Sequence, residues 1–298
     1  MSATLERTES LRGHGAMLLF SMLVAGSFSL GHIAAPLIEP AALNAVRFLV
    51  ASIIIGTLVF TTKSLKREHM QAPWRYLLMG GLFAIYFVLM FEALKTTNPI
   101  STSAVFTLVP VMSAGFGWLL LRQITTPRMA LALSIAGVGA LWVIFRGDLN
   151  AFLAFDIGTG EMIFFVGCIA HAFYTPLVRR LNRGEPPLVF TLGMLLSGFV
   201  ILGIYGARDI IATDWLSLPP IVIITLLYTA IFASAVTFFL VQYATMRLPS
   251  AKVMAYTYLV PAWVILWEAA MGNGMANAFI LIGVGLTILA LMMLLREG

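Results

Sequence analysis

Residues 276–295 read ANAFILIGVGLTILALMMLL, a stretch without a single charged side chain. A helix needs about 20 apolar residues to cross the hydrocarbon core of a bilayer, so this stretch predicts a transmembrane helix. Its glycine pair, GVG at 283–285, recurs as GVG at 137–139, inside another apolar stretch at 128–145. The stretch therefore indicates both a membrane protein and an internal repeat.

The composition of the whole chain agrees with a membrane protein. Of its 298 residues 60% are hydrophobic and only 10% are charged, and the mean hydropathy is +0.97. A soluble domain carries about 25% charged residues because water wets its surface. Too few charges remain here to cover a water-facing globule, which excludes a soluble protein with a large core.

Nine further apolar stretches precede the last one. Together they predict ten spans, near 15–35, 40–61, 74–95, 100–121, 128–145, 159–180, 187–207, 217–243, 250–270 and 276–295. The first stretch is longer than the apolar core of a signal peptide, about 7 to 15 residues, so we expect a retained helix. The alternative is cleavage near IAA at 33–35.

The positions of the basic residues predict the orientation. The two termini and the even-numbered loops hold fourteen Lys and Arg residues, against three in the odd-numbered loops. Cytoplasmic loops carry this excess, so both termini are expected in the cytoplasm. The same placement explains the net charge of +5 without a nucleic-acid partner.

Three short segments recur in the same order. GAMLLF at 15–20 resembles GEMIFF at 160–165, LVP at 108–110 returns at 259–261, and GVG returns as described. A half with five crossings ends on the side opposite its start, so its copy inserts upside down. We therefore expect an all-α fold of two inverted five-helix repeats around a central cavity: a tail at 1–14, and repeats at 15–147 and 148–298.

Arg47 is the clearest candidate for function because it lies inside the second span. An arginine at the centre of a span costs about 2.5 to 3.5 kcal/mol on insertion scales. It either extends to the interface and braces neighbouring carbonyls, or it binds an anion or a carboxylate. Asn44, three residues earlier, shares its helix face and favours the interior.

Other polar and aromatic side chains are candidates for a cavity wall that suits amphipathic or aromatic ligands. For those near span ends the alternative is an interfacial belt. These candidates are Ser27, His32, Tyr86, Ser103, Thr107, His171, Tyr174, Gln242, Lys252, Tyr256 and Trp263. We also expect Pro110 and Pro261, in the fourth span of each half, to be paired hinges; static kinks are the alternative.

The chemistry missing from the sequence narrows the function. The acids Glu39, Glu92, Glu161 and Glu268 all lie near span ends, which favours facilitated or histidine-dependent transport over a carboxylate-driven antiport. There is one cysteine, no HExxH, no phosphate-binding GxxxxGK[ST] and no GxSxG. We therefore expect neither a metal nor a cofactor, and a membrane-embedded enzyme is only a minor alternative.

The chain resembles the drug/metabolite transporter superfamily in its ten-helix EamA-type branch. The resemblance rests on SFS at 27–29, Pro40, Leu43, RF at 47–48, YA at 243–244, LVP at 259–261 and the two GVG segments. The glutamate that follows the fourth span of each repeat in that family is matched by Glu268. In the first half Arg122 stands there instead.

Within that superfamily the chain is similar to YddG-type bacterial exporters of amino acids. The resemblance implies export of aromatic or other neutral amino acids by alternating access across the bacterial inner membrane. It leaves open other substrates of the superfamily: nucleotide sugars, sugar phosphates or cationic drugs. The expected partners are a small-molecule substrate and the lipid bilayer, with the chain a monomer or weak dimer.

Overall fold

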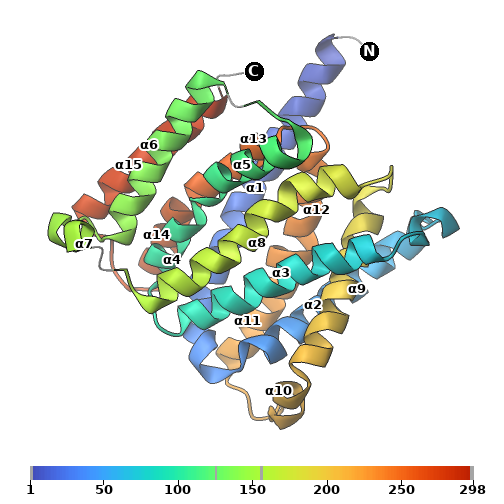
Figure 1. Ribbon diagram of the computed structural model, residues 1–298. Helices are drawn as coiled ribbons and strands as arrows, with labels where there is room; N and C mark the ends of the chain where they lie inside the picture. The colour runs from blue at the N-terminus through green and yellow to red at the C-terminus, as the bar shows by residue number, and fades with distance from the viewer. Residues whose placement is uncertain (1–2, 125, 155–156, 296–298) are drawn as a thin grey trace.

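The computed structural model describes residues 3–124, 126–154 and 157–295, and every regular element in these ranges is helical. Ten of the helices, counted over the described residues, are long and apolar enough to cross a membrane, which confirms the predicted ten spans (Figure 1).

The spans of the first half are α1 (Ala3–Ala34), α2 (Pro40–Thr61), α3 (Trp74–Leu94), α4 with α5 (Pro99–Phe106 and Val109–Leu121) and α6 (Pro127–Ile144). Three spans of the second half are single helices: α8 (Thr159–Leu181), α9 (Pro187–Tyr205) and α15 (Ala278–Leu295). The eighth span consists of α11 (Pro220–Ala230), η3 (Ile231–Val236) and α12 (Thr237–Thr245). The ninth span consists of α13 (Ser250–Ala255), η4 (Tyr256–Leu259) and α14 (Val260–Ala270). Short helices η1 (Ala35–Leu37), η2 (Arg67–Met70), α7 (Leu149–Ala154) and α10 (Ala207–Ala212) lie between them. The first helix begins well before residue 15, so the predicted tail is helical from Ala3.

Proline determines where many of these helices begin. Pro40, Pro99, Pro127, Pro187 and Pro220 each occupy the first turn of a spanning segment. The first turn leaves backbone N–H groups unpaired, so the missing N–H of proline costs nothing there and its fixed φ favours the helix. Proline therefore marks the start of half of the ten spanning segments.

The contacts between helices repeat when the two halves are exchanged. In the first half α3 packs on α8 and α9; in the second, α12 packs on α1 and α11 on α2. Likewise α5 contacts α8, as α14 contacts α1. In Figure 1 α2 and α9 run in opposite directions, and both chain ends lie at the upper end of the molecule. The two halves are therefore inverted repeats.

The last spans of the halves, α6 and α15, cross at the two GVG segments. A Cβ atom added to Gly139 would lie 2.7 Å from the carbonyl oxygen of Gly283, and one added to Gly283 would lie 2.7 Å from the carbonyl oxygen of Gly139. Glycine lets the two backbones approach this closely. The repeated motif is thus one of the contacts by which the two halves meet.

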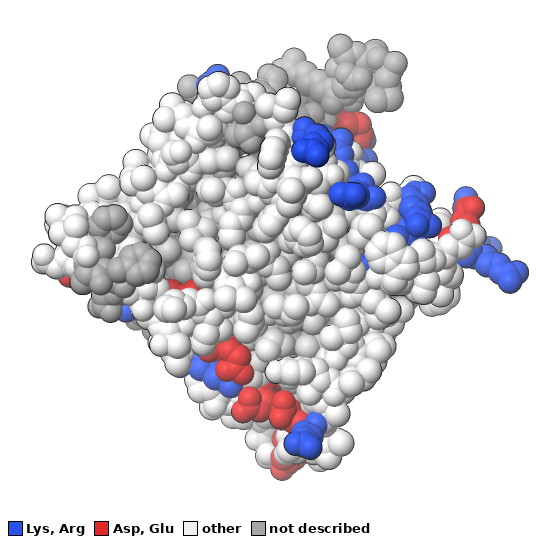
Figure 2. Space-filling view, in the orientation of Figure 1, with Lys and Arg blue, Asp and Glu red and all other residues white. Residues whose placement is uncertain are grey.

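The surface has the distribution of charge expected of a membrane protein. On the face shown in Figure 2, Lys and Arg predominate along the upper and right edges, and the lower end carries acidic residues together with a few basic ones. The wide area between them is uncharged. Large apolar side chains such as Ile53 and Phe60 point outward, being 61% and 69% exposed. Such a surface is stable against lipid chains and unstable in water.

Candidate functional site

Three spans are interrupted inside the molecule. The fourth span breaks between α4 and α5, and the ninth changes to the 3-10 helix η4 before α14. Pro110 and Pro261 lie in the first turn that follows each break. The eighth span contains the π-helix η3, a form found often at functional sites. The helices are therefore irregular where the two halves meet.

A small void lies at this meeting place. Its volume is about 10 Å³, room for about one water molecule. The first half contributes α1, α3 and α4 to its wall, and the second contributes α8, η3 and α12. The lining residues are Phe20, Val24, Phe83, Tyr86, Phe87, Phe106, His171, Ala233, Thr237, Phe238 and Val241. We call this the central void.

Aromatic rings pack closely around the central void. The rings of Phe83 and Phe238 stack with centroids 4.2 Å apart, and the ring of His171 stacks on Tyr86 at 4.6 Å. Phe106 lies 5.2 Å from the same histidine ring. A wall of this kind offers flat apolar faces to a ligand that carries a ring.

Several polar atoms at the central void have no hydrogen-bond partner among the described residues. They are the hydroxyl of Tyr86, both ring nitrogens of His171 and the hydroxyl of Thr237, and all three side chains are buried. Leaving a buried polar group unpaired costs about 1 to 3 kcal/mol, and most such groups in proteins are paired. A polar ligand inside the void could pair with all three of these side chains.

Arg47 lies directly behind the wall of the central void. Its Nε donates to the Ser234 hydroxyl at 2.6 Å, and Nη2 donates to the Ala233 carbonyl at 2.7 Å in the π-helix. Its Nη1 donates to the Asn44 side chain at 3.2 Å, and its guanidinium lies 3.7 Å from the centre of the Phe87 ring. The π-helix thus holds a cation that is completely buried.

No carboxylate in the described part of the chain lies within ion-pair distance of Arg47. The positive charge is held by neutral oxygens and by a ring face alone. An unneutralised cation next to a void favours an anionic group within it.

Two further predicted residues support the wall from behind. The Gln242 amide donates to the Tyr174 hydroxyl at 2.6 Å, and the Tyr174 ring lies 4.1 Å from the Phe83 ring. The Gln242 carbonyl oxygen is buried without a partner. Opening the wall at Phe83 would bring both side chains toward the void.

The other predicted site residues lie outside the lining of the central void. His32 hydrogen-bonds the Leu94 carbonyl, Tyr256 hydrogen-bonds His14, and Trp263 donates to Ser21. The hydroxyls of Ser103 and Thr107 donate to carbonyls of their own helix, Ser27 is buried without a partner, and Lys252 lies half-buried in α13.

The sequence reasoning missed most of the aromatic wall. Phe83, Tyr86 and Phe87 stand at the i, i+3, i+4 spacing of one helix face, a signal that could have been used. Thr237 and Phe238 follow the π-helix, whose extra residue turns them inward. The π-helix itself contains no proline or glycine from which it could have been predicted.

The buried acids lie at the two ends of the molecule. Glu161 accepts hydrogen bonds from the hydroxyls of Thr97 and Ser101, both at 2.6 Å. Glu185, in the loop after α8, pairs with Arg75 at 2.6 Å. Burial by itself would raise the pKa of Glu185, but the hydrogen bonds from Arg75 and from backbone N–H groups, with the charge of Arg75, together outweigh it and the pKa is lowered. These acids are occupied by protein partners.

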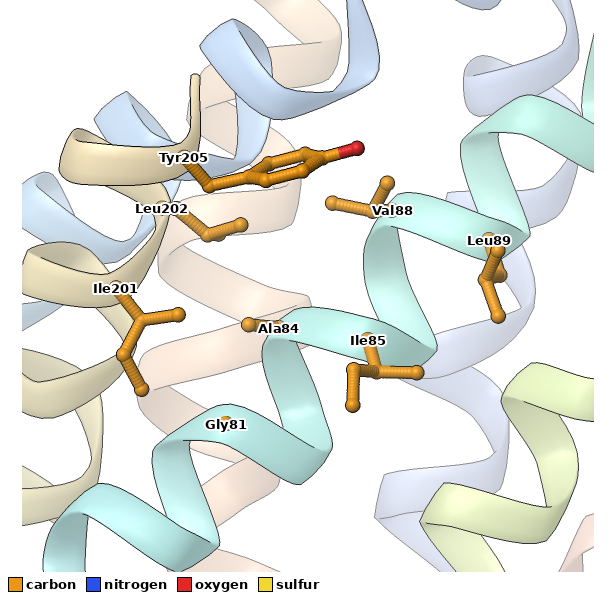
Figure 3. Close-up of a pocket in the computed structure, with 8 residues that line it drawn as sticks. All are labelled: Gly81, Ala84, Ile85, Val88, Leu89, Ile201, Leu202 and Tyr205. Carbon is orange, nitrogen blue, oxygen red and sulfur yellow. The ribbon is translucent and has the colours of Figure 1, made fainter. Parts of the chain in front are cut away.

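A larger groove lies at the lipid-facing surface. Figure 3 shows side chains of α3 and α9 facing each other across it, from Gly81 and Ile85 to Leu202 and Tyr205. Its volume is about 350 Å³ and its lining is almost entirely apolar. Because Tyr205 is 72% exposed, the groove opens sideways toward lipid. It lacks the converging polar groups of the central void.

Comparison with known proteins places the chain in a family. It is 25% identical over 279 residues to the uncharacterized transporter YyaM of Bacillus subtilis (strain 168), across 93% of this chain and 91% of that protein. It is 26% identical to an uncharacterized transporter of Archaeoglobus fulgidus, across 91% and 93% of the two chains. A solved crystal structure shares the fold with a TM-score of 0.71 at 18% identity, over 97% of this chain and 96% of the other.

The family model of the EamA-like transporters matches the chain twice, at residues 11–145 and 158–296. The chain therefore belongs to the EamA-like transporter family of the drug/metabolite transporter superfamily, a family of transporters and not of enzymes.

Proposed function

We propose that this transporter exports neutral amino acids, aromatic ones above all, and that the central void is its binding site in a closed state. The observation that carries the proposal is the set of three unpartnered polar side chains that face one void beside a buried arginine. An aromatic amino acid matches these features in chemistry. Its ring would stack on the wall, and its carboxylate would lie toward Arg47.

Alternating access is the mechanism we propose for the two inverted repeats, residues 15–147 and 148–298, with the helical segment before residue 15 as a tail. The paired breaks at Pro110 and Pro261 lie at corresponding places in the halves, where hinges would open the void to one side at a time. The lysine and arginine bias supports a bacterial inner membrane with cytoplasmic termini. A monomer or weak dimer suffices, since one chain contributes both walls.

The alternative substrates fit the central void less well. A sugar phosphate or a nucleotide sugar favours several deep cations. The fully buried arginines among the described residues are Arg47 and Arg75, and Arg75 is already neutralised by Glu185. A cationic drug favours a deep acid, and the central void has none in its lining.

A growth assay tests the proposed export. Bacteria that express the transporter should tolerate a toxic phenylalanine analogue at several-fold higher concentration than cells with an empty vector. Arg47→Leu should remove the protection, while the exposed Arg208→Leu, at matched membrane levels, should keep it. Equal tolerance with and without the transporter, for analogues of every neutral amino acid, would contradict the proposal.

A further inference from the structure

We infer that His171 takes up a proton in exchange for the ammonium group of the substrate, so that export is coupled to inward proton movement. The inference rests on the proposed function and adds a driving force to it. It starts from a feature that substrate stacking does not need, which is a buried histidine with both ring nitrogens unpartnered.

His171 differs in its surroundings from the other histidines. His14 hydrogen-bonds Tyr256, His32 hydrogen-bonds the Leu94 carbonyl, and His69 accepts from the Lys66 backbone. His171 is 2% exposed and lines the central void. Its ring is held by neighbouring aromatic rings at 4.6 to 5.2 Å. The protein therefore fixes the plane of this ring and leaves its nitrogens available.

The chemistry of imidazole makes a proton and an ammonium group exclude each other. A neutral ring has one nitrogen that accepts a hydrogen bond, so it can bind the ammonium of an amino acid. A protonated ring donates from both nitrogens and carries a positive charge, so it repels that ammonium. An imidazole that water reaches exchanges its proton near pH 6.5, close to the pH on both sides of a bacterial membrane.

The groups that face His171 strengthen this exclusion. The charged group on the facing side is Arg47 of α2, which reaches the void wall through Phe87 and Ala233. The titratable groups around the ring are the phenols of Tyr86 of α3 and Tyr174 of its own helix, and the buried thiol of Cys168 lies three residues before it on that helix.

The remaining elements at the central void bring no charge to it. From α1, α4 and α12 the lining is apolar apart from the hydroxyl of Thr237. The acid of the same helix, Glu161, is bonded to Thr97 and Ser101. A protonated His171 therefore lies near the cation of Arg47, and no carboxylate balances the two positive charges. The site consequently holds either the proton or the substrate ammonium, but not both at once.

Charge balance follows from this exclusion. The amino acid leaves as a zwitterion without net charge, and one proton enters as the site returns empty of substrate. Each cycle therefore moves one positive charge inward. Transport should respond to a pH difference and, separately, to membrane voltage.

Proteoliposomes with the intact transporter test the coupling. Labelled phenylalanine is placed at equal concentration on both sides, with the voltage clamped by potassium and valinomycin. Vesicles at pH 6.0 inside and 7.5 outside should accumulate the label several-fold, because protons leaving drive the amino acid inward. In His171→Gln, which keeps a polar group but cannot titrate, the exchange that remains should not change with pH, and no label should accumulate. His69→Gln, a histidine of η2, should accumulate it as the wild type does.

The outcomes separate the inference from the proposed function. Exchange without pH-driven accumulation by the wild type, or accumulation retained by His171→Gln, overturns the coupling and leaves amino-acid transport intact. No exchange of any neutral amino acid overturns both. If His171→Gln does not fold, the wild type decides the matter. Its phenylalanine affinity should fall as the pH falls, by up to about tenfold per pH unit, and an affinity that does not fall on acidification contradicts the inference.

Discussion

At the scale of single residues, Arg47 shows how a buried charge can be held without a counter-ion. Its planar fork reaches three oxygens on two helices and lies 3.7 Å from the centre of the Phe87 ring. A lysine has one point charge and no planar face, so it cannot satisfy the same set. The residue therefore fixes the π-helix against α2 as well as placing charge beside the central void.

We expect Arg47→Lys to destabilise the protein although it keeps the charge. At least one of the Asn44, Ala233 and Ser234 oxygens loses its donor, at a cost of about 1 to 3 kcal/mol. The apparent melting temperature in detergent should fall by several degrees. Arg208→Lys, at an exposed site in α10, is the matched control and should leave it unchanged. Equal melting temperatures for all three proteins would refute this account of Arg47.

Glu185 gives a prediction that depends on pH. Its pKa in the folded protein lies below the ordinary value of 4.5, so the ion pair with Arg75 stabilises the fold above that pH and is lost as the pH falls through the lowered pKa. Glu185→Gln leaves a buried arginine unpaired and should cost about 3 kcal/mol at pH 7. The difference in melting temperature should persist down to about pH 5 and shrink at more acid pH. A difference that grows on acidification is the contrary result.

Residue types were easier to predict than residue positions. Arg47, Tyr86 and His171 could be named as candidates because polar groups inside a span are costly. The wall around them was missed because apolar aromatic residues are common in every membrane helix. Which of them face inward depends on the rotation of each helix, and this is fixed by contacts with other helices, such as Phe83 on Phe238.

At the scale of elements, the two GVG segments give a sharply matched experiment. A methyl group on Gly139 or Gly283 would meet the backbone of the opposite helix at 2.7 Å, whereas Gly137 and Gly285 have nothing within 4 Å. Gly139→Ala and Gly283→Ala should therefore separate α6 from α15. Gly137→Ala and Gly285→Ala should stabilise slightly, since alanine is the better helix former by about 0.5 to 1 kcal/mol.

Thermal unfolding in detergent measures all four variants. The expected order places Gly137→Ala and Gly285→Ala at or above the wild type, and the other two several degrees below it. The sequence showed that the motif repeats but not which glycine of each pair touches the partner helix. If the four variants have the same melting temperature, α6 and α15 do not cross at Gly139 and Gly283 as the structure shows.

The paired prolines test motion and not stability. Pro110 and Pro261 lie in first turns, where proline costs the helix little, so alanine should leave the melting temperature nearly unchanged. If the breaks are hinges, the double variant should transport several-fold more slowly, because alanine lets the helix continue across each break. Pro176→Ala, which replaces a proline inside α8 and not at either break, is the variant against which the transport rate of the double variant is compared. Wild-type rates in the double variant would favour static kinks.

At the scale of the whole molecule, the number of spans and the repeat could be predicted because hydropathy and turn residues are local signals. A half with five spans ends on the side of the membrane opposite its start, so the second half had to be inverted relative to the first. The structure shows this inversion. The closed state could not be predicted, because closure depends on how two halves fit together. The π-helix and the 3-10 turn η4 are likewise set by that fit and not by their own sequences.

The central claim is that the central void, closed in this structure, is where a neutral amino acid crosses the membrane. Counterflow in proteoliposomes tests it most directly, with unlabelled phenylalanine inside and a trace of labelled phenylalanine outside. The account predicts transient accumulation of label above protein-free vesicles, and its loss in Tyr86→Ala, which removes one wall of the void. No accumulation by the wild type for any neutral amino acid, or full accumulation by Tyr86→Ala, would contradict it.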